Sequence, residues 1–180
     1  MTDWKNIWIH FILHKNTNIC IIKNMQPNSH EYYMLLAIKE AKEAKKLGDW
    51  PFGAVVIYKG KVIGKGKAED KTKGDVTDHA EFIAIRKACR TLGTNNLRDC
   101  VIYCTNEPCI MCAAGIFQAH IPQVVIGASR DDLFGLLRSR KIRIEHLVED
   151  SEHKIEIIRG VLKDTILELF NDIEKNTCES

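Results

Sequence analysis

The sequence has no long apolar run, and this excludes a transmembrane helix of ordinary length. A helix that spans a bilayer needs about 20 mostly apolar residues, whereas Ile7–Leu13 is short and contains His10. No small-residue cleavage site follows this stretch, so we expect no signal peptide. The sequence also lacks a strong charge of either sign. Its net charge of +2 does not by itself indicate a nucleic-acid partner.

The cysteines are odd in number and lack the spacing of a disulfide framework. A secreted disulfide scaffold is therefore not expected, and the pattern fits a reducing compartment in which paired thiols more often hold metal. We expect a cytoplasmic protein with no membrane partner. Cys89, Cys100 and Cys104 lie in apolar segments and are predicted to be inert core residues. The seven cysteines are Cys20, Cys89, Cys100, Cys104, Cys109, Cys112 and Cys178.

The order of the expected elements predicts an α/β fold. A length of 180 residues and a hydrophobic fraction of 45% suit one domain with a sizeable core. Asn28 and Glu31 resemble a capping box at the start of the first helix. Helices are expected over 28–47, 79–92, 108–120 and 164–173, with a short one near Glu145. Strands are expected over 55–58, 61–63, 100–105, 124–127 and 154–158. This order predicts a three-layer α/β/α sandwich on a five-stranded mixed sheet.

The two ends of the chain differ from this pattern. Residues 1–24 show no helical or strand period, so we interpret residues 1–27 as an N-terminal extension or upstream sequence and 28–180 as the domain. Residues 65–78 are polar and are predicted to form a loop. Residues 129–180 carry more Asp and Glu than Lys and Arg.

Two short stretches carry the chemistry of the chain. One is His79-Ala80-Glu81, and the other is Pro108-Cys109-Ile110-Met111-Cys112. One imidazole and two thiolates suit a catalytic Zn²⁺, which takes three protein ligands and leaves a fourth position for water. Both stretches fall at predicted helix starts, where the partial positive charge favours thiolate over thiol. Glu81 lies two residues from His79 and could carry a proton between the water and a substrate nitrogen.

Simpler readings of the same residues stay open at this point. Cys109 and Cys112 alone could form a dithiol redox pair, and Glu81 alone could be a surface glutamate. A structural zinc site usually needs four protein ligands. His120, His146 and His153 have no second Cys or His beside them, so the sequence does not supply an obvious fourth ligand.

The combination of a His-x-Glu stretch and a later Pro-Cys-x-x-Cys stretch resembles the cytidine deaminase-like superfamily. The resemblance covers residues 28–128, and less clearly continues to 175. Its nearest branch contains guanine deaminases and tRNA-specific adenosine deaminases. The resemblance implies zinc on His79, Cys109 and Cys112, proton transfer by Glu81, and usually a homodimer. It also implies substrate contacts by the ring of Phe52 and the backbone N–H of Ala80.

Three departures from the family pattern bear on the substrate. Ala68 stands where an Asn is usual, and the C-terminal end is not basic. Asp78 replaces a small residue, and it could contact a substrate amino group or cap the helix, of which we favour the cap. We therefore expect a purine-like free base or nucleoside, for example guanine, rather than tRNA. The alternatives are adenosine deamination at the tRNA wobble position and a non-catalytic zinc-stabilised binding module. Candidate basic patches for RNA are the lysines of 59–73 and the group Arg138, Arg140, Lys141 and Arg143.

Overall fold

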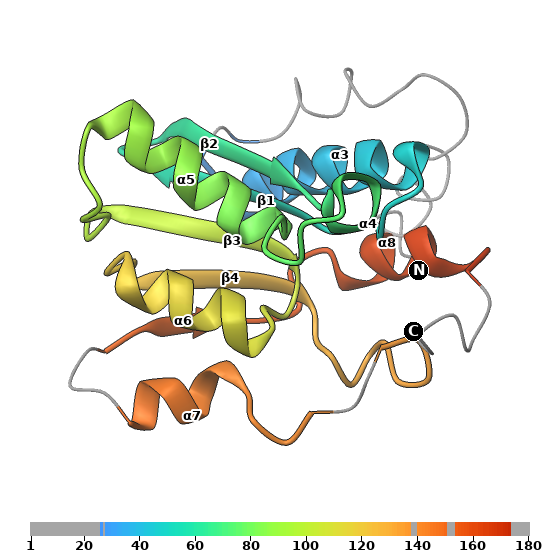
Figure 1. The fold of residues 1–180 in the computed structure, drawn as a ribbon. Coiled ribbons are helices and arrows are strands. Elements are labelled where there is room, and N and C mark those ends of the chain that lie inside the picture. Colours follow the sequence, from blue (N-terminus) through green and yellow to red (C-terminus); the bar gives the residue numbers. More distant parts are fainter. Residues whose placement is uncertain (1–25, 27, 138–139, 151–153, 174–180) are drawn as a thin grey trace, which may run out of the picture.

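A five-stranded mixed sheet forms the centre of the fold, with helices on both of its faces (Figure 1). The computed structural model describes residues 26, 28–137, 140–150 and 154–173. The strands are β1 (Gly53–Tyr58), β2 (Lys61–Lys67), β3 (Cys100–Asn106), β4 (Gln123–Ala128) and β5 (Glu156–Ile158). Their order in the sheet is β2-β1-β3-β4-β5. β1 is antiparallel to β2 and β3, whereas β3, β4 and β5 run parallel. This confirms the predicted fold class.

Successive side chains of a strand point to opposite faces of the sheet, so the buried strands present apolar side chains on both faces. Helices cover each of these faces. α3 and α8 pack on one face with Val55 of β1 and Tyr103 of β3. α5 and α6 pack on the other face with Val56 and Ile102. The helices are α3 (His30–Leu47), α4 (Asp70–Lys73), α5 (Ala80–Leu92), α6 (Ile110–Gln118), α7 (Ile144–Glu149) and α8 (Lys163–Leu167), followed by a 3₁₀ turn, Glu168–Phe170.

Two glycines of β2 let α5 approach the sheet closely. A Cβ atom at Gly64 would lie 2.2 Å from the carbonyl oxygen of Ala84, and one at Gly66 would lie 1.9 Å from that of Ala80. Both distances are far below van der Waals contact, so any larger residue would push the helix outward. The start of α5, which carries His79 and Glu81, is therefore fixed against the sheet by the absence of these two side chains.

The structure corrects several predicted boundaries. Ser29, not Asn28, is the N-cap of α3, and its hydroxyl accepts the backbone N–H of Tyr32. Part of the predicted polar loop over 65–78 instead completes β2 and forms α4, whereas residues 74–78 are a loop as expected. The final predicted helix is shorter, and a 3₁₀ turn replaces its second half. Residues 1–25 lie outside the described part of the chain, so the predicted extension is not tested. Within the residues that the structure does describe, no helix is both long and apolar enough to cross a membrane.

Candidate metal centre

The three predicted metal ligands come from the starts of two neighbouring helices. His79 is the N-cap of α5, and Cys109 is the N-cap of α6. Cys112 lies in the first turn of α6 and is fully buried. α5 and α6 pack against each other on the same face of the sheet (Figure 1). The fold therefore brings together side chains that are 30 and 33 residues apart.

The distances between the ligand atoms fit a tetrahedral zinc ion. His79 Nδ1 lies 3.6 Å from Cys109 Sγ and 3.4 Å from Cys112 Sγ. All three ligand atoms lie within 4.8 Å of one another. Zn–S bonds of about 2.3 Å and Zn–N bonds of about 2.0 Å at tetrahedral angles would place a nitrogen and a sulfur about 3.5 Å apart. The donor set and its spacing therefore match zinc, and three protein ligands leave one position open for catalysis.

A hydrogen bond couples the two thiols of the site. A hydrogen bond with Cys112, together with one from His79, lowers the pKa of Cys109 to about 3. The same hydrogen bond, with burial, raises the pKa of Cys112. The Cys109 thiolate also raises the pKa of His79. A lowered pKa favours the thiolate form that binds a metal, and metal binding displaces the thiol protons that remain.

Glu81 occupies the first turn of α5, beside the ligands. Only 8% of the residue is exposed, and burial raises the pKa of its carboxyl group. Burial also raises the pKa of Cys104, with the Glu81 charge adding to the effect. A carboxyl group with a raised pKa suits a proton carrier that works near neutral pH. A surface glutamate, the simpler reading, is excluded by this burial.

The three predicted substrate contacts have different surroundings. Ala80 is buried at the start of α5. The ring of Phe52 packs against Trp50 and Phe170, each with a centroid distance of 6.0 Å. Asp78 does not cap the helix, which corrects the favoured reading, because its carboxylate accepts a hydrogen bond from Arg86 Nη2 at 2.5 Å. Substrate contact by these residues stays a prediction.

A buried carboxylate that the sequence analysis missed lies just before the Pro-Cys-x-x-Cys stretch. The side chain of Glu107 is only 2% exposed. It accepts hydrogen bonds from Arg143 Nη1 at 3.0 Å and from Arg159 Nη1 at 3.3 Å. The backbone N–H of Arg130 donates to it at 3.0 Å. Arg143 is therefore part of an internal ion-pair cluster, not of the exposed basic patch that the sequence suggested.

The fold and the metal centre together define a zinc-dependent hydrolytic deaminase. Residues 27–128 match the cytidine and deoxycytidylate deaminase zinc-binding region. This match covers more than half of the chain, so the protein belongs to the cytidine and deoxycytidylate deaminase family. The readings as a redox dithiol pair or as a non-catalytic module are set aside by this assignment.

The most informative relatives are deaminases of two kinds. The chain is 33% identical over 147 residues to a tRNA-specific adenosine deaminase of Aquifex aeolicus, covering 79% of this chain and 97% of the relative. It is 40% identical over 105 residues to a guanine deaminase of Bacillus subtilis, covering 58% of this chain and 67% of the relative. A solved tRNA:A34 deaminase, studied for A-to-I editing at the wobble position of transfer RNA, superposes with a TM-score of 0.66 at 30% identity. It covers 77% of this chain and 98% of that chain.

Proposed function

We propose that this protein deaminates adenosine in tRNA at the wobble position. The observation that carries the proposal is the extent of the match. The similarity to the Aquifex aeolicus tRNA-specific enzyme extends over nearly the whole length of that protein, whereas the guanine deaminase match is shorter. The comparisons thus favour the tRNA alternative over the free base that the sequence analysis preferred.

The proposed reaction is the hydrolysis of a C–N bond. Water adds to C6 of adenine, the bond to the exocyclic amine breaks, and inosine and ammonia form. Zinc, when bound, activates the attacking water by lowering its pKa. In our proposal Glu81 accepts a proton from that water and delivers it to the ring nitrogen next to C6. It then takes the remaining proton of the hydroxyl added at C6 and delivers it to the departing amine, which leaves as ammonia. The buried position of Glu81 beside the ligands supports this role.

The surface that borders the metal centre suits a nucleic-acid substrate. β3 and β4 are parallel, so the segments that follow them leave the same edge of the sheet. The segment after β3 holds Cys109, and the segment after β4 holds Phe134, which is 81% exposed. An exposed aromatic ring can stack on an unpaired base. Arg140, which follows β4 in the same segment, is also exposed.

A free purine base is the second candidate substrate. The 40% identity with the Bacillus subtilis guanine deaminase favours it, since this value exceeds the identity with the tRNA-specific relative. That match nevertheless covers a smaller share of both proteins. A homodimer and a cytoplasmic location stay predictions under either candidate.

A substrate panel separates the two candidates. The zinc-loaded protein would be incubated with an anticodon stem-loop that carries adenosine at the wobble position, and in parallel with guanine, adenine, cytosine and their nucleosides. We expect inosine in the RNA and little ammonia from the free compounds. Ammonia from guanine with no inosine in the RNA would replace our proposal by the second candidate. An anticodon stem-loop with guanosine at the wobble position is the matched control.

A further inference from the structure

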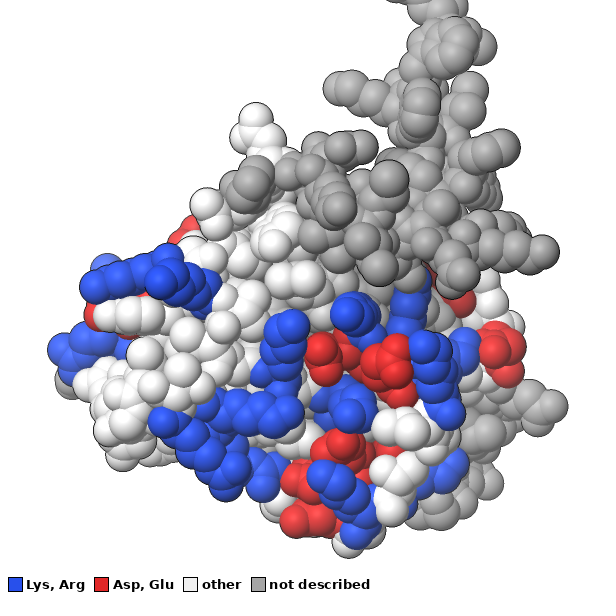
Figure 2. Space-filling view, turned by 90° about the horizontal axis from the view of Figure 1, so that it is seen from above, with Lys and Arg blue, Asp and Glu red and all other residues white. Residues whose placement is uncertain are grey.

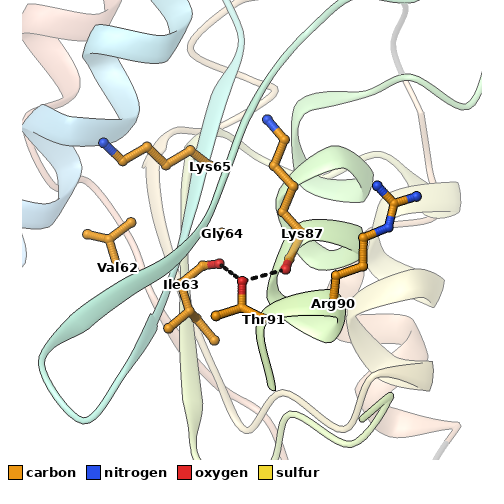
Figure 3. Close-up of a pocket in the computed structure, with 7 residues that line it drawn as sticks. All are labelled: Val62, Ile63, Gly64, Lys65, Lys87, Arg90 and Thr91. Atoms are coloured by element: carbon orange, nitrogen blue, oxygen red, sulfur yellow. Dashed lines mark hydrogen bonds between the residues drawn. The ribbon is translucent and has the colours of Figure 1, made fainter. Parts of the chain in front are cut away.

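A groove lies between the edge strand β2 and the C-terminal half of α5, separate from the metal centre (Figure 3). Its volume is about 490 Å³, and it opens widely to solvent. Lys87 and Arg90 lie seven and ten residues beyond the start of α5. At about 1.5 Å per residue, they are roughly 10–15 Å from Ala80 along the helix. The residues that line the groove are Val62, Ile63, Gly64, Lys65, Lys87, Arg90 and Thr91.

The floor of this groove is fixed. The hydroxyl of Thr91 lies 3.0 Å from the carbonyl oxygen of Ile63 and 2.9 Å from that of Lys87, and it can donate to either (Figure 3). This hydroxyl links α5 directly to β2. Gly64 beneath it has no room for a side chain, because a Cβ atom would meet the backbone of Ala84 at 2.2 Å. The two walls of the groove therefore hold their separation without a ligand.

The groove is lined by three positive side chains and by no acidic one. Lys65, Lys87 and Arg90 are exposed, and none forms an ion pair with any residue that the structure describes. Nearby lysines behave differently, because Lys67 and Lys73 both pair with Glu69. Figure 3 shows Lys65 on β2 directed to one side of the strand and the other two cations on α5 on its opposite side, with all three charged ends directed away from Thr91. Figure 2 shows many Lys and Arg side chains on the face seen from above, and acidic side chains lie between some of them.

We propose that this groove binds the phosphodiester backbone of the RNA substrate at a distance from the target base. Unpaired Lys and Arg side chains on a preformed groove favour phosphate, because binding neutralises them and releases counterions from the RNA. Because the groove lies roughly 10–15 Å along α5 from Ala80, the contact falls away from the nucleotide that reacts, and our proposal assigns it to the stem. The proposal rests on the proposed function, since it assumes that RNA is the substrate.

The test replaces the three cations with neutral side chains of similar size. The groove variant is Lys65→Gln/Lys87→Gln/Arg90→Gln. The control variant is Lys39→Gln/Arg98→Gln/Lys154→Gln, which removes the same charge from exposed positions elsewhere in the fold. Zinc content and melting temperature of both variants should match those of the wild type. The affinity of the full chain for an anticodon stem-loop is then measured between 50 and 200 mM salt.

The expected result is a smaller salt dependence for the groove variant only. Each lost phosphate contact lowers the slope of log K against log salt by about 0.7–0.9, so three contacts should lower it by about 2–3. Between 50 and 200 mM salt, the affinity of the wild type should therefore fall by a factor that is about 20 to 40 times larger than the factor for the groove variant. The groove variant should convert an oligonucleotide of the anticodon loop alone, without its stem, as fast as the wild type does.

The remaining outcomes test the groove proposal and the proposed function separately. Equal slopes for the groove and control variants would overturn the groove. Loss of binding to polyglutamate, with RNA binding unaffected, would instead assign the groove to an acidic protein. If the wild type binds the stem-loop through the groove but forms no inosine, the groove stands and the proposed function fails.

Discussion

Substitution of Gly66 by Ala should inactivate the enzyme by displacing α5, although it removes no metal ligand and no catalytic side chain. The new Cβ atom would lie 1.9 Å from the carbonyl oxygen of Ala80, whereas ordinary contact begins at 3.4 Å. The start of α5 must therefore move outward by about 1.5 Å, because both atoms belong to a closely packed interior. Ala80 stands between His79 and Glu81, so both side chains move with it.

This displacement sets the size of the expected effects. Overpacking of this kind costs about 1–3 kcal/mol of unfolding free energy. The melting temperature should fall by roughly 2–4 °C for each kcal/mol. A misplacement of about 1 Å at an active site can cost about 10²-fold in rate, so we expect turnover to fall by at least that factor. The assays are thermal unfolding, zinc content by mass spectrometry of the native protein, and product formation.

Gly74→Ala is the matched control for this prediction. Gly74 has a positive φ of 67°, so Ala is strained there, but nothing lies within 4 Å of the added Cβ atom. The control should lose about 1 kcal/mol or more of stability and keep its turnover. If Gly66→Ala showed wild-type turnover, the close approach of β2 would not position the catalytic helix.

Three further predictions concern the metal ligands, the ion-pair cluster and the N-terminal residues. Cys112→Ser should lose zinc and melt at a lower temperature, because metal binding is coupled to folding; full zinc occupancy in the purified variant would contradict the ligand assignment. Glu107→Gln should cost about 3 kcal/mol in chemical denaturation, since it removes the buried partner of Arg143 and Arg159; a loss below 1 kcal/mol would show that Asp131 and Glu145 suffice for the two arginines. A chain that begins at Met25 should bind zinc and melt within a few degrees of the full chain, because no core-forming pattern precedes Asn28; a large fall would mean that Trp4, Trp8 and Phe11 pack on the domain.

The metal centre was predictable because its signal lies in local sequence. His79 and Cys109 stand at helix starts, and Cys112 lies in the first turn of the second helix. Gly93 marks the end of the first of these helices, and an apolar strand and Pro108 precede the second. The structure brings the three side chains together as that pattern indicated. The five strands were also predictable from their apolar runs, although their ends were not.

The features that sequence reasoning missed depend on contacts between distant residues. β2 was predicted to end at Ile63 because Gly64, Lys65, Gly66 and Lys67 look like a loop. In the structure the lysines face outward and the glycines lie beneath α5, so the same pattern forms a strand. Asp78 pairs with a residue eight positions later, beyond ordinary helical spacing. Glu107 meets Arg159 only after the chain has passed through α7 and β5.

The direct test of the central claim is the exchange of Glu81 for Gln in the zinc-loaded enzyme. The amide keeps the shape of the side chain but cannot carry a proton, so zinc content should stay at one per chain while turnover falls by about 10²–10⁴-fold or more. Glu31→Gln, which removes an exposed carboxylate from the first turn of α3, is the matched control and should keep both. Turnover of Glu81→Gln near that of the wild type would contradict the account of this site as a deaminase centre that works through Glu81.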